Sequence, residues 1–110
     1  MKVIASAAII LATALFNPAH AAVDEDAAKA LAKKNDCFKC HAVDKTKKGP
    51  SYKKIALKYK GKADAEAVLI KQITTGPKVK MEDGTEENHK IIDTKDQGEM
   101  KNLIGWILSL

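Results

Sequence analysis

The sequence predicts a small all-α domain of about four helices, packed around a bulky group that is not an amino-acid side chain. The apolar residues recur at helical spacing, and no alternation of apolar and polar residues is long enough to indicate a sheet. Beyond the first 21 residues the chain has one Trp, two Tyr and one Phe, with many Ala. So small a set of large apolar side chains indicates that something else fills the centre of the domain.

The first 21 residues have the features of an export signal that is removed. Lys2 gives a positive start, residues 3–16 are uncharged and almost wholly apolar, and Ala19-His20-Ala21 has the small-x-small pattern of a cleavage site. A retained membrane anchor is the alternative, but the 14-residue apolar run is shorter than the roughly 20 residues that cross a bilayer. We therefore expect a signal peptide at 1–21, a single domain at 22–110 and a periplasmic protein without stable membrane insertion.

The first two predicted helices lie on either side of a loop. The first runs from Asp24 to Asn35, with acidic residues at its start and lysines at its end, as the helix dipole favours. Residues 36–50 are expected to form a loop that the Gly49-Pro50 pair closes. Ser51 is a suitable cap for a short second helix, which Gly61 ends.

Two further helices are predicted in the second half. One runs from about Asp64 to Thr75 and ends at the Gly76-Pro77 pair. Residues 78–93 have no clear period and contain a turn signal at Asp83-Gly84. Thr94 is expected to cap the last helix, whose inner apolar stripe consists of Met100, Leu103, Ile104, Ile107 and Leu108. Gly105 within this helix either allows the first helix to approach closely or is simply tolerated.

The motif that carries chemistry is Cys37-Phe38-Lys39-Cys40-His41, a CxxCH sequence. Two thiols on one turn can add to the two vinyl groups of one haem, and the following His can then ligate its iron. A disulfide or a thioredoxin-type redox pair leaves His41 or the missing strands unexplained. A zinc site needs four ligands, which Cys37, Cys40, His41 and His89 could just supply. The motif favours one covalent haem c.

Beyond this motif, the whole of residues 22–110 resembles the small class I bacterial cytochromes c of the c551/c552 type. The resemblance rests on the order of the motifs, which are the CxxCH, Gly49-Pro50-Ser51-Tyr52, Ile55-Ala56-x-x-Tyr59, the helix that ends at Gly76, and Leu103-Ile104-x-Trp106-Ile107-Leu108. It implies a class I cytochrome c fold in which the first and last helices cross beside the haem. It also implies that the Pro50 carbonyl accepts the Nδ1 proton of His41, and it places Tyr52 among the residues that bind the cofactor.

The resemblance does not extend to the second axial ligand of the iron. Such proteins usually supply a Met just before the last helix, commonly followed by Pro, and this sequence has no Met-Pro. His89 lies five positions before Thr94, at the expected place, whereas Met81 lies eight residues earlier. Met100 has the spacing of a core residue. We expect His89 to be the distal ligand, with Met81 or an open sixth site as alternatives. A second imidazole would lower the reduction potential relative to a thioether.

The charge pattern bears on partners. The chain contains no Arg, and removal of Lys2 leaves 18 lysines against 14 acidic residues, a net charge of about +4. Proteins that bind nucleic acid depend on Arg for bidentate contacts with bases and phosphates, so DNA or RNA binding is not expected. Eight lysines crowd one stretch, and these are Lys45, Lys47, Lys48, Lys53, Lys54, Lys58, Lys60 and Lys62. They are either ordinary solvated surface or a docking face for acidic redox donors and acceptors.

These features together predict an electron carrier and not an enzyme. No residue outside the haem ligands is arranged for acid–base or nucleophilic chemistry, and an iron with six ligands has no position for a substrate. Two other functions stay open at this point. One is a haem module that binds a small gas, and the other is an electron-transfer subunit of a periplasmic redox enzyme.

Overall fold

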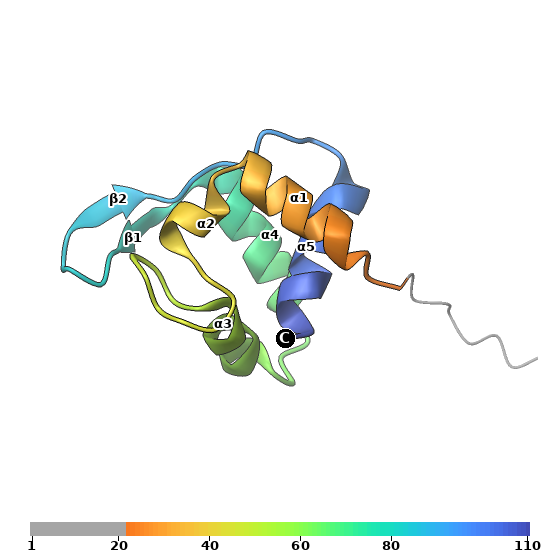
Figure 1. Ribbon diagram of the computed structural model, residues 1–110, viewed down its shortest axis with the longest axis horizontal. Coiled ribbons are helices and arrows are strands. Elements are labelled where there is room, and N and C mark those ends of the chain that lie inside the picture. Colours follow the sequence, from red (N-terminus) through yellow and green to blue (C-terminus); the bar gives the residue numbers. More distant parts are fainter. Residues whose placement is uncertain (1–21) are drawn as a thin grey trace, which may run out of the picture.

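The computed structural model describes residues 22–110, so the predicted signal peptide lies outside the described residues. Helices dominate it, as predicted: four longer helices and one single-turn helix are accompanied by a small antiparallel hairpin (Figure 1). In chain order the elements are α1 (Glu25–Lys34), α2 (Cys37–Cys40), α3 (Tyr52–Tyr59), α4 (Ala65–Thr75), β1 (Lys78–Lys80), β2 (Glu86–Asn88) and α5 (Gln97–Leu108).

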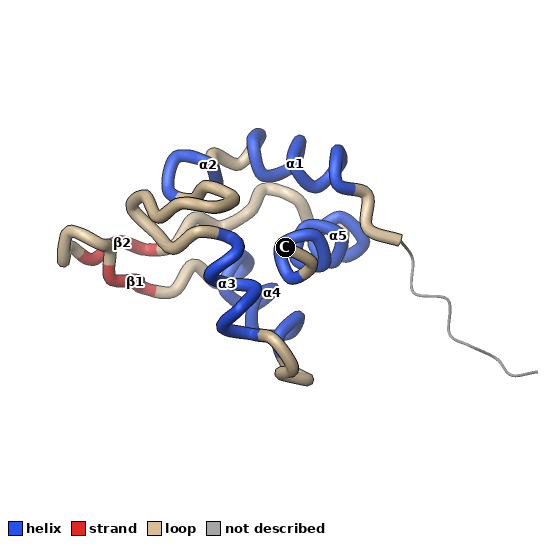
Figure 2. The backbone as a smooth tube through the Cα atoms, turned by 60° about the horizontal axis from the view of Figure 1, so that its bottom comes forward, coloured by secondary structure: helices blue, strands red, loops and turns tan. Residues whose placement is uncertain are grey.

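Helix α5 is the centre of the fold, because α1, α3 and α4 all pack against it. Figure 2, which shows α5 nearly end-on, has α1 on one side of it and α3 and α4 on the other. The buried side chains of α5 are Met100, Leu103, Ile104, Trp106 and Ile107, and they meet Ala28 and Ala32 of α1 in one apolar cluster. The small side chains of α1 are what permit this close crossing.

Gly105 permits a close approach, although the nearest atom belongs to Val23, two residues before α1 begins, and not to the helix itself. A Cβ at this position would lie 3.3 Å from Cγ2 of Val23. Nearby, the amide of Asn102 donates to the carbonyl of Asp24 at 2.8 Å and its Oδ1 accepts from the Asp24 N–H at 2.8 Å. The start of α1 is thereby fixed to the middle of α5.

The helix caps agree with the sequence at two places and differ at a third. The side chains of Asp24 and Ser51 accept backbone N–H groups of the first turns of α1 and α3, as their residue types predict. Thr94 was expected to cap α5, and this is wrong. The helix begins at Gln97, so Asp96 occupies the capping position and its Oδ1 accepts from the Glu99 N–H at 3.0 Å. The Thr94 hydroxyl donates instead to the Glu99 carboxylate at 2.6 Å.

Two elements were not expected. Residues 36–50 contain the single turn α2, which follows directly on α1 because Asp36 adopts a left-handed backbone conformation with φ of 58°. Residues 78–93 contain the β1–β2 hairpin, in which Lys78 pairs with Asn88 and Lys80 with Glu86. One turn is too short to show a period, and strands of three mostly exposed residues carry no apolar alternation.

Candidate haem site

Helix α2 brings the two cysteines onto one turn. Cys37 is its first residue and Cys40 its last, and both are half-buried free thiols. The left-handed Asp36 directs the chain from α1 into this turn, and the His41 N–H closes it by donating to the Cys37 carbonyl at 2.9 Å. Burial raises the pKa of the Cys37 thiol. The two sulfurs and the following imidazole therefore emerge from one rigid turn.

His41 is held in one orientation by its neighbours. Its Nδ1 lies 2.7 Å from the Pro50 carbonyl oxygen, which can only accept, so Nδ1 carries the proton and Nε2 is the free nitrogen. The ring also stacks on Tyr52 with 5.2 Å between centroids. Burial lowers the pKa of His41, which keeps the imidazole neutral as ligation requires.

The close approach of the 47–50 loop to His41 depends on Gly49. A Cβ on Gly49 would lie 2.8 Å from Cε1 of the imidazole, closer than a real Cβ contact. The Gly49 N–H donates to the Cys40 carbonyl at 2.8 Å, which fixes the loop against the end of α2. Gly49 and Pro50 thus act together, one by giving room and the other by accepting a hydrogen bond.

Tyr52 and Trp106 form the aromatic base of the site. Tyr52 is buried at the start of α3, and its ring meets Trp106 of α5 edge-on with centroids 5.6 Å apart. Burial raises the pKa of Tyr52, so its hydroxyl stays protonated. The indole Nε1 of Trp106 is buried and has no hydrogen-bond partner among the described residues. A buried N–H donor without a protein acceptor is consistent with a bound non-protein group that supplies the acceptor.

The imidazole ring of His89 lies near that of His41. Its ring centroid lies 6.2 Å from that of His41, with 42° between the ring planes. A ligating imidazole nitrogen lies about 2 Å from its metal and its ring centre about 1 Å beyond, so two rings on opposite sides of one ion have centroids about 6 Å apart. Nδ1 of His89 lies 2.9 Å from the Lys90 carbonyl, which leaves Nε2 free here as well.

The end of α4 positions His89. The His89 N–H donates to the Pro77 carbonyl at 2.8 Å. Pro77 and His89 directly adjoin Lys78 and Asn88, the last residue pair of the hairpin. Gly76 ends α4 in the left-handed conformation, with φ of 59°, and a Cβ there would lie 2.8 Å from the His89 carbonyl oxygen. The residue that stops the helix is therefore also the one that lets the His89 backbone lie against it.

Met81, the alternative ligand, lies elsewhere. Met81 pairs with Thr85 near the tip of the hairpin, where its N–H donates to the Thr85 carbonyl at 2.7 Å. It is four residues beyond Pro77, which bonds to His89, and four residues of strand span about 13 Å. Met100 is only 4% exposed, within the core face of α5.

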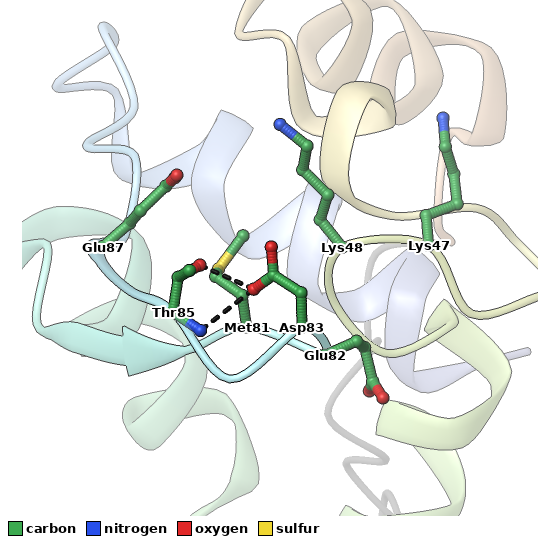
Figure 3. Close-up of a pocket in the computed structure, with 7 residues that line it drawn as sticks. All are labelled: Lys47, Lys48, Met81, Glu82, Asp83, Thr85 and Glu87. Atoms are coloured by element: carbon green, nitrogen blue, oxygen red, sulfur yellow. Dashed lines mark hydrogen bonds between the residues drawn. The ribbon is translucent and has the colours of Figure 1, made fainter.

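Met81 borders a surface hollow of about 200 Å³ together with Lys47, Lys48, Glu82, Asp83, Thr85 and Glu87. Figure 3 shows its thioether pointing into this space, with Lys47 and Lys48 on the opposite side. Asp83 accepts from both the backbone N–H and the hydroxyl of Thr85, and these bonds lower the pKa of Asp83. The Glu82 N–H donates to the Lys48 carbonyl at 3.1 Å, so the hairpin is anchored to the loop that follows the CxxCH.

Cys37 and Cys40 are not bonded to one another in the described part of the chain. Residues 22–110 contain no group of three or more His, Cys, Asp or Glu side chains that could hold a metal ion. The donor set of two thiols and two opposed imidazoles fits one covalently attached haem.

The lysines of the predicted cluster are exposed, and none of the eight forms a salt bridge within the described residues. They occupy the loop after α2, helix α3 and the turn that follows it. Among residues 22–110, no helix is long and apolar enough to cross a membrane.

Comparison with known proteins agrees with this geometry. The cytochrome c family model matches residues 25–110. The crystal structure of the class 1 cytochrome MtoD from Sideroxydans lithotrophicus ES-1 is 63% identical in sequence, with a TM-score of 0.77 over 80% of this chain and 97% of that one. The crystal structure of cytochrome c552 from Nitrosomonas europaea is 34% identical, with a TM-score of 0.61 over 74% of this chain and 98% of that one.

Two curated relatives match over shorter segments. Cytochrome c-551 of Pseudomonas aeruginosa is 46% identical over 46 residues, which is 42% of this chain and 44% of that protein. Cytochrome c-552 of Nitrosomonas europaea is 43% identical over 65 residues, 59% of each. The matched segments thus span about half the length of these relatives. The family model, the fold and the CxxCH turn nevertheless agree, and the chain belongs to the cytochrome c family as a small class I member with one covalent haem c.

Proposed function

We propose that this protein is an exported electron carrier whose haem c is attached through Cys37 and Cys40 and ligated by His41 and His89. The observation that carries this proposal is the 6.2 Å separation of the two imidazole rings, each with its Nδ1 next to a backbone carbonyl. When bound, haem c supplies one iron that alternates between the ferrous and ferric states. The side chains of this chain then fix the ligand geometry and cover the group.

Each residue has a distinct part in this arrangement. Covalent bonds from the sulfurs of Cys37 and Cys40 would hold the haem, so the exported carrier would not lose it. Pro50 accepts the Nδ1 proton of His41 and fixes the tautomer. Tyr52 and Trp106 exclude water beside the ligand. With an imidazole from His41 and another from His89, the iron would have no open position for a substrate, which favours a carrier over an enzyme.

The ligand set bears on the potential. A second imidazole is a stronger donor to ferric iron than a thioether is, so the ferric state is favoured and the reduction potential is lower. Glu86 and Glu87, exposed on the strand that leads to His89, act in the same direction, although solvent screens them. We place this protein at the reducing end of the exported cytochromes.

The exposed lysine cluster is proposed as the docking face for acidic redox partners. A stretch of eight lysines without salt bridges within the described residues steers and briefly holds an acidic surface, and salt weakens such contacts. Export to the periplasm by residues 1–21 completes the proposal. The mass of the protein recovered from the periplasm tests it, because removal of residues 1–21 and addition of one haem are both expected.

The ferric near-infrared spectrum tests the ligands directly. The purified holoprotein is expected to be low-spin, with a charge-transfer band at the position of two imidazoles and sharp α and β bands on reduction. A band at the Met–iron position would reject His89 in favour of Met81. A high-spin spectrum with rapid binding of carbon monoxide to the ferrous form would instead indicate a gas-binding module.

A further inference from the structure

The buried amide of Asn35 has no part in the function described so far. It is 2% exposed at the end of α1, two residues before Cys37. Its Nδ2 donates to the Leu31 carbonyl at 3.0 Å, and its Oδ1 accepts from the Asp93 N–H at 2.9 Å. The first bond finishes the helix. The second joins the chain 58 positions away, which the end of a helix does not require.

The partner of Asn35 belongs to the segment that follows His89. Residues 89–96 contain no helix or strand, and they connect His89 to α5. Two backbone bonds hold this segment to α4 and its end: His89 N–H to the Pro77 carbonyl at 2.8 Å, and Ile92 N–H to the Ile73 carbonyl at 2.9 Å. Within residues 22–110, Asn35 is the one side chain from outside the segment that bonds to its backbone.

Asn35 also touches the haem-attachment turn. The backbone carbonyl oxygen of Asn35 lies 4.0 Å from Sγ of Cys37, and the next residue is Asp36, whose backbone is left-handed. Asn35 therefore contacts the start of the CxxCH through its backbone carbonyl, and the segment that carries His89 through its side chain. The neighbouring Lys34–Asp93 ion pair, at 3.8 Å between largely exposed side chains, contributes little by comparison.

We propose that Asn35 is a positioning residue that holds the His89 segment against the haem-attachment turn and slows the departure of His89 from the iron. This inference rests on the proposed role of His89 as distal ligand. A buried hydrogen bond of this kind is lost whenever the segment moves outward, so its free energy adds to the barrier against ligand release.

The test measures how fast cyanide binds to the ferric holoprotein. At saturating cyanide the observed rate equals the rate at which the distal ligand leaves. Asn35→Ala removes the acceptor, and Asp93→Pro removes the donor N–H while leaving Asn35 in place. Each is expected to raise the limiting rate about tenfold, the size expected for one buried hydrogen bond. The double variant is expected to be no faster than the faster single variant, because both remove the same bond.

Two matched controls separate this role from general loss of stability. Asp93→Ala keeps the N–H and removes only the exposed carboxylate. Asn102→Ala removes an asparagine side chain that bonds α5 to Asp24, at the opposite end of α1 from Asn35. Both are expected to keep the wild-type limiting rate. Should Asp93→Pro not fold, the contrast between Asn35→Ala and Asn102→Ala still decides the matter.

Two results would overturn the role of Asn35. One is a wild-type limiting rate of cyanide binding in Asn35→Ala. The other is a fold-increase of this rate in the double variant that equals the product of the fold-increases in the two single variants. The near-infrared band separates this failure from the failure of the proposed function. A bis-imidazole band together with unchanged cyanide rates rejects only Asn35. A band of another type rejects His89 itself.

Discussion

The two sides of the haem site are built in different ways. On the proximal side, His41 is fixed by Pro50, nine residues away, and the Tyr52 N–H donates to the Ala42 carbonyl at 2.9 Å. On the distal side, the segment of His89 is fixed by residues of α4 and by Asn35, which is 58 positions from its partner. His41 is held by its own sequence neighbourhood, and His89, the proposed distal ligand, by the assembled fold.

This difference predicts which side of the haem site unfolds locally first. Local unfolding begins where few buried contacts hold a segment, and residues 86–91 are mostly exposed whereas residues 49–52 are half-buried or buried. Covalent attachment also leaves His41 next to the iron after a local opening. We therefore expect perturbations of the proximal side to remove the cofactor, and perturbations of the distal side to leave the cofactor attached while they change its ligand and potential.

The largest expected effect is on the proximal side. Replacing both Cys37 and Cys40 with Ala removes the only thiols of the chain, so covalent attachment of haem is expected to be abolished. A chain of this size has too small a core to fold well without the group, and its helical content is expected to fall. Haem that remains with the protein after acidic acetone extraction, together with far-ultraviolet circular dichroism, measures both effects.

A matched change on the distal side serves as the control for the cysteine pair. Met81→Leu keeps the size of a side chain in the hairpin and touches no thiol. It is expected to retain haem fully. Normal covalent haem in the double cysteine variant would contradict the attachment proposed here.

The next largest effect comes from exchanging the distal ligand. His89→Met keeps a potential ligand at this position but replaces an imidazole with a thioether, which stabilises ferrous iron. The reduction potential is expected to rise by on the order of 0.1–0.2 V, a fraction of the roughly 0.8 V that axial ligands span. Spectroelectrochemical titration measures it, and covalent haem content is expected to stay at the wild-type level.

The control for this exchange is again Met81→Leu, which is expected to leave the potential unchanged because Met81 lies near the tip of the hairpin. If Met81→Leu lowers the potential and His89→Met does not raise it, the ligand assignment is reversed. A loss of haem in His89→Met would instead contradict the independence of the two sides.

Gly76→Ala tests how closely the distal segment lies against α4. The added Cβ would lie 2.7 Å from Cγ1 of Ile91 and 2.8 Å from the backbone oxygen of His89, at a φ of 59°. Strain and displacement together are expected to lower the free energy of unfolding by about 2 kcal/mol and to speed cyanide binding. Urea denaturation of the ferric protein measures the first effect.

Gly84→Ala is the matched control for Gly76→Ala. It also has a positive φ, of 87°, but no atom lies within 4 Å of its would-be Cβ. Only the backbone strain remains, so a loss of about 1 kcal/mol and an unchanged cyanide rate are expected. Equal effects of the two variants on both measurements would show that contact with the His89 segment is unimportant.

The same contrast explains what the sequence could predict. The CxxCH, the Gly49-Pro50 pair and the helices are local patterns, and such patterns can be recognised in one amino-acid sequence. The hairpin was missed because its paired strands are mostly exposed, and Asn35 was missed because nothing near it in sequence indicates a partner at Asp93. His89 stays a prediction that rests on its distance from the last helix in a family resemblance, since the contacts that position it are tertiary.

The cap of α5 gives the smallest and most local test. Both Thr94 and Asp96 have capping side chains, and the sequence favoured Thr94 because Gln97 follows it by three positions. The structure begins the helix at Gln97 and uses Asp96, whose Oδ1 accepts from the Glu99 N–H at 3.0 Å. Asp96→Ala is therefore expected to lower the free energy of unfolding by about 1 kcal/mol.

Thr94→Ala is the paired measurement, again by urea denaturation. It removes a hydrogen bond between two largely exposed side chains, the Thr94 hydroxyl and the Glu99 carboxylate, so a loss of about 0.5 kcal/mol or less is expected. A larger loss in Thr94→Ala than in Asp96→Ala would place the start of α5 two residues earlier. Because α5 is the helix on which α1, α3 and α4 all pack, both losses should appear in global unfolding and neither in the rate of cyanide binding.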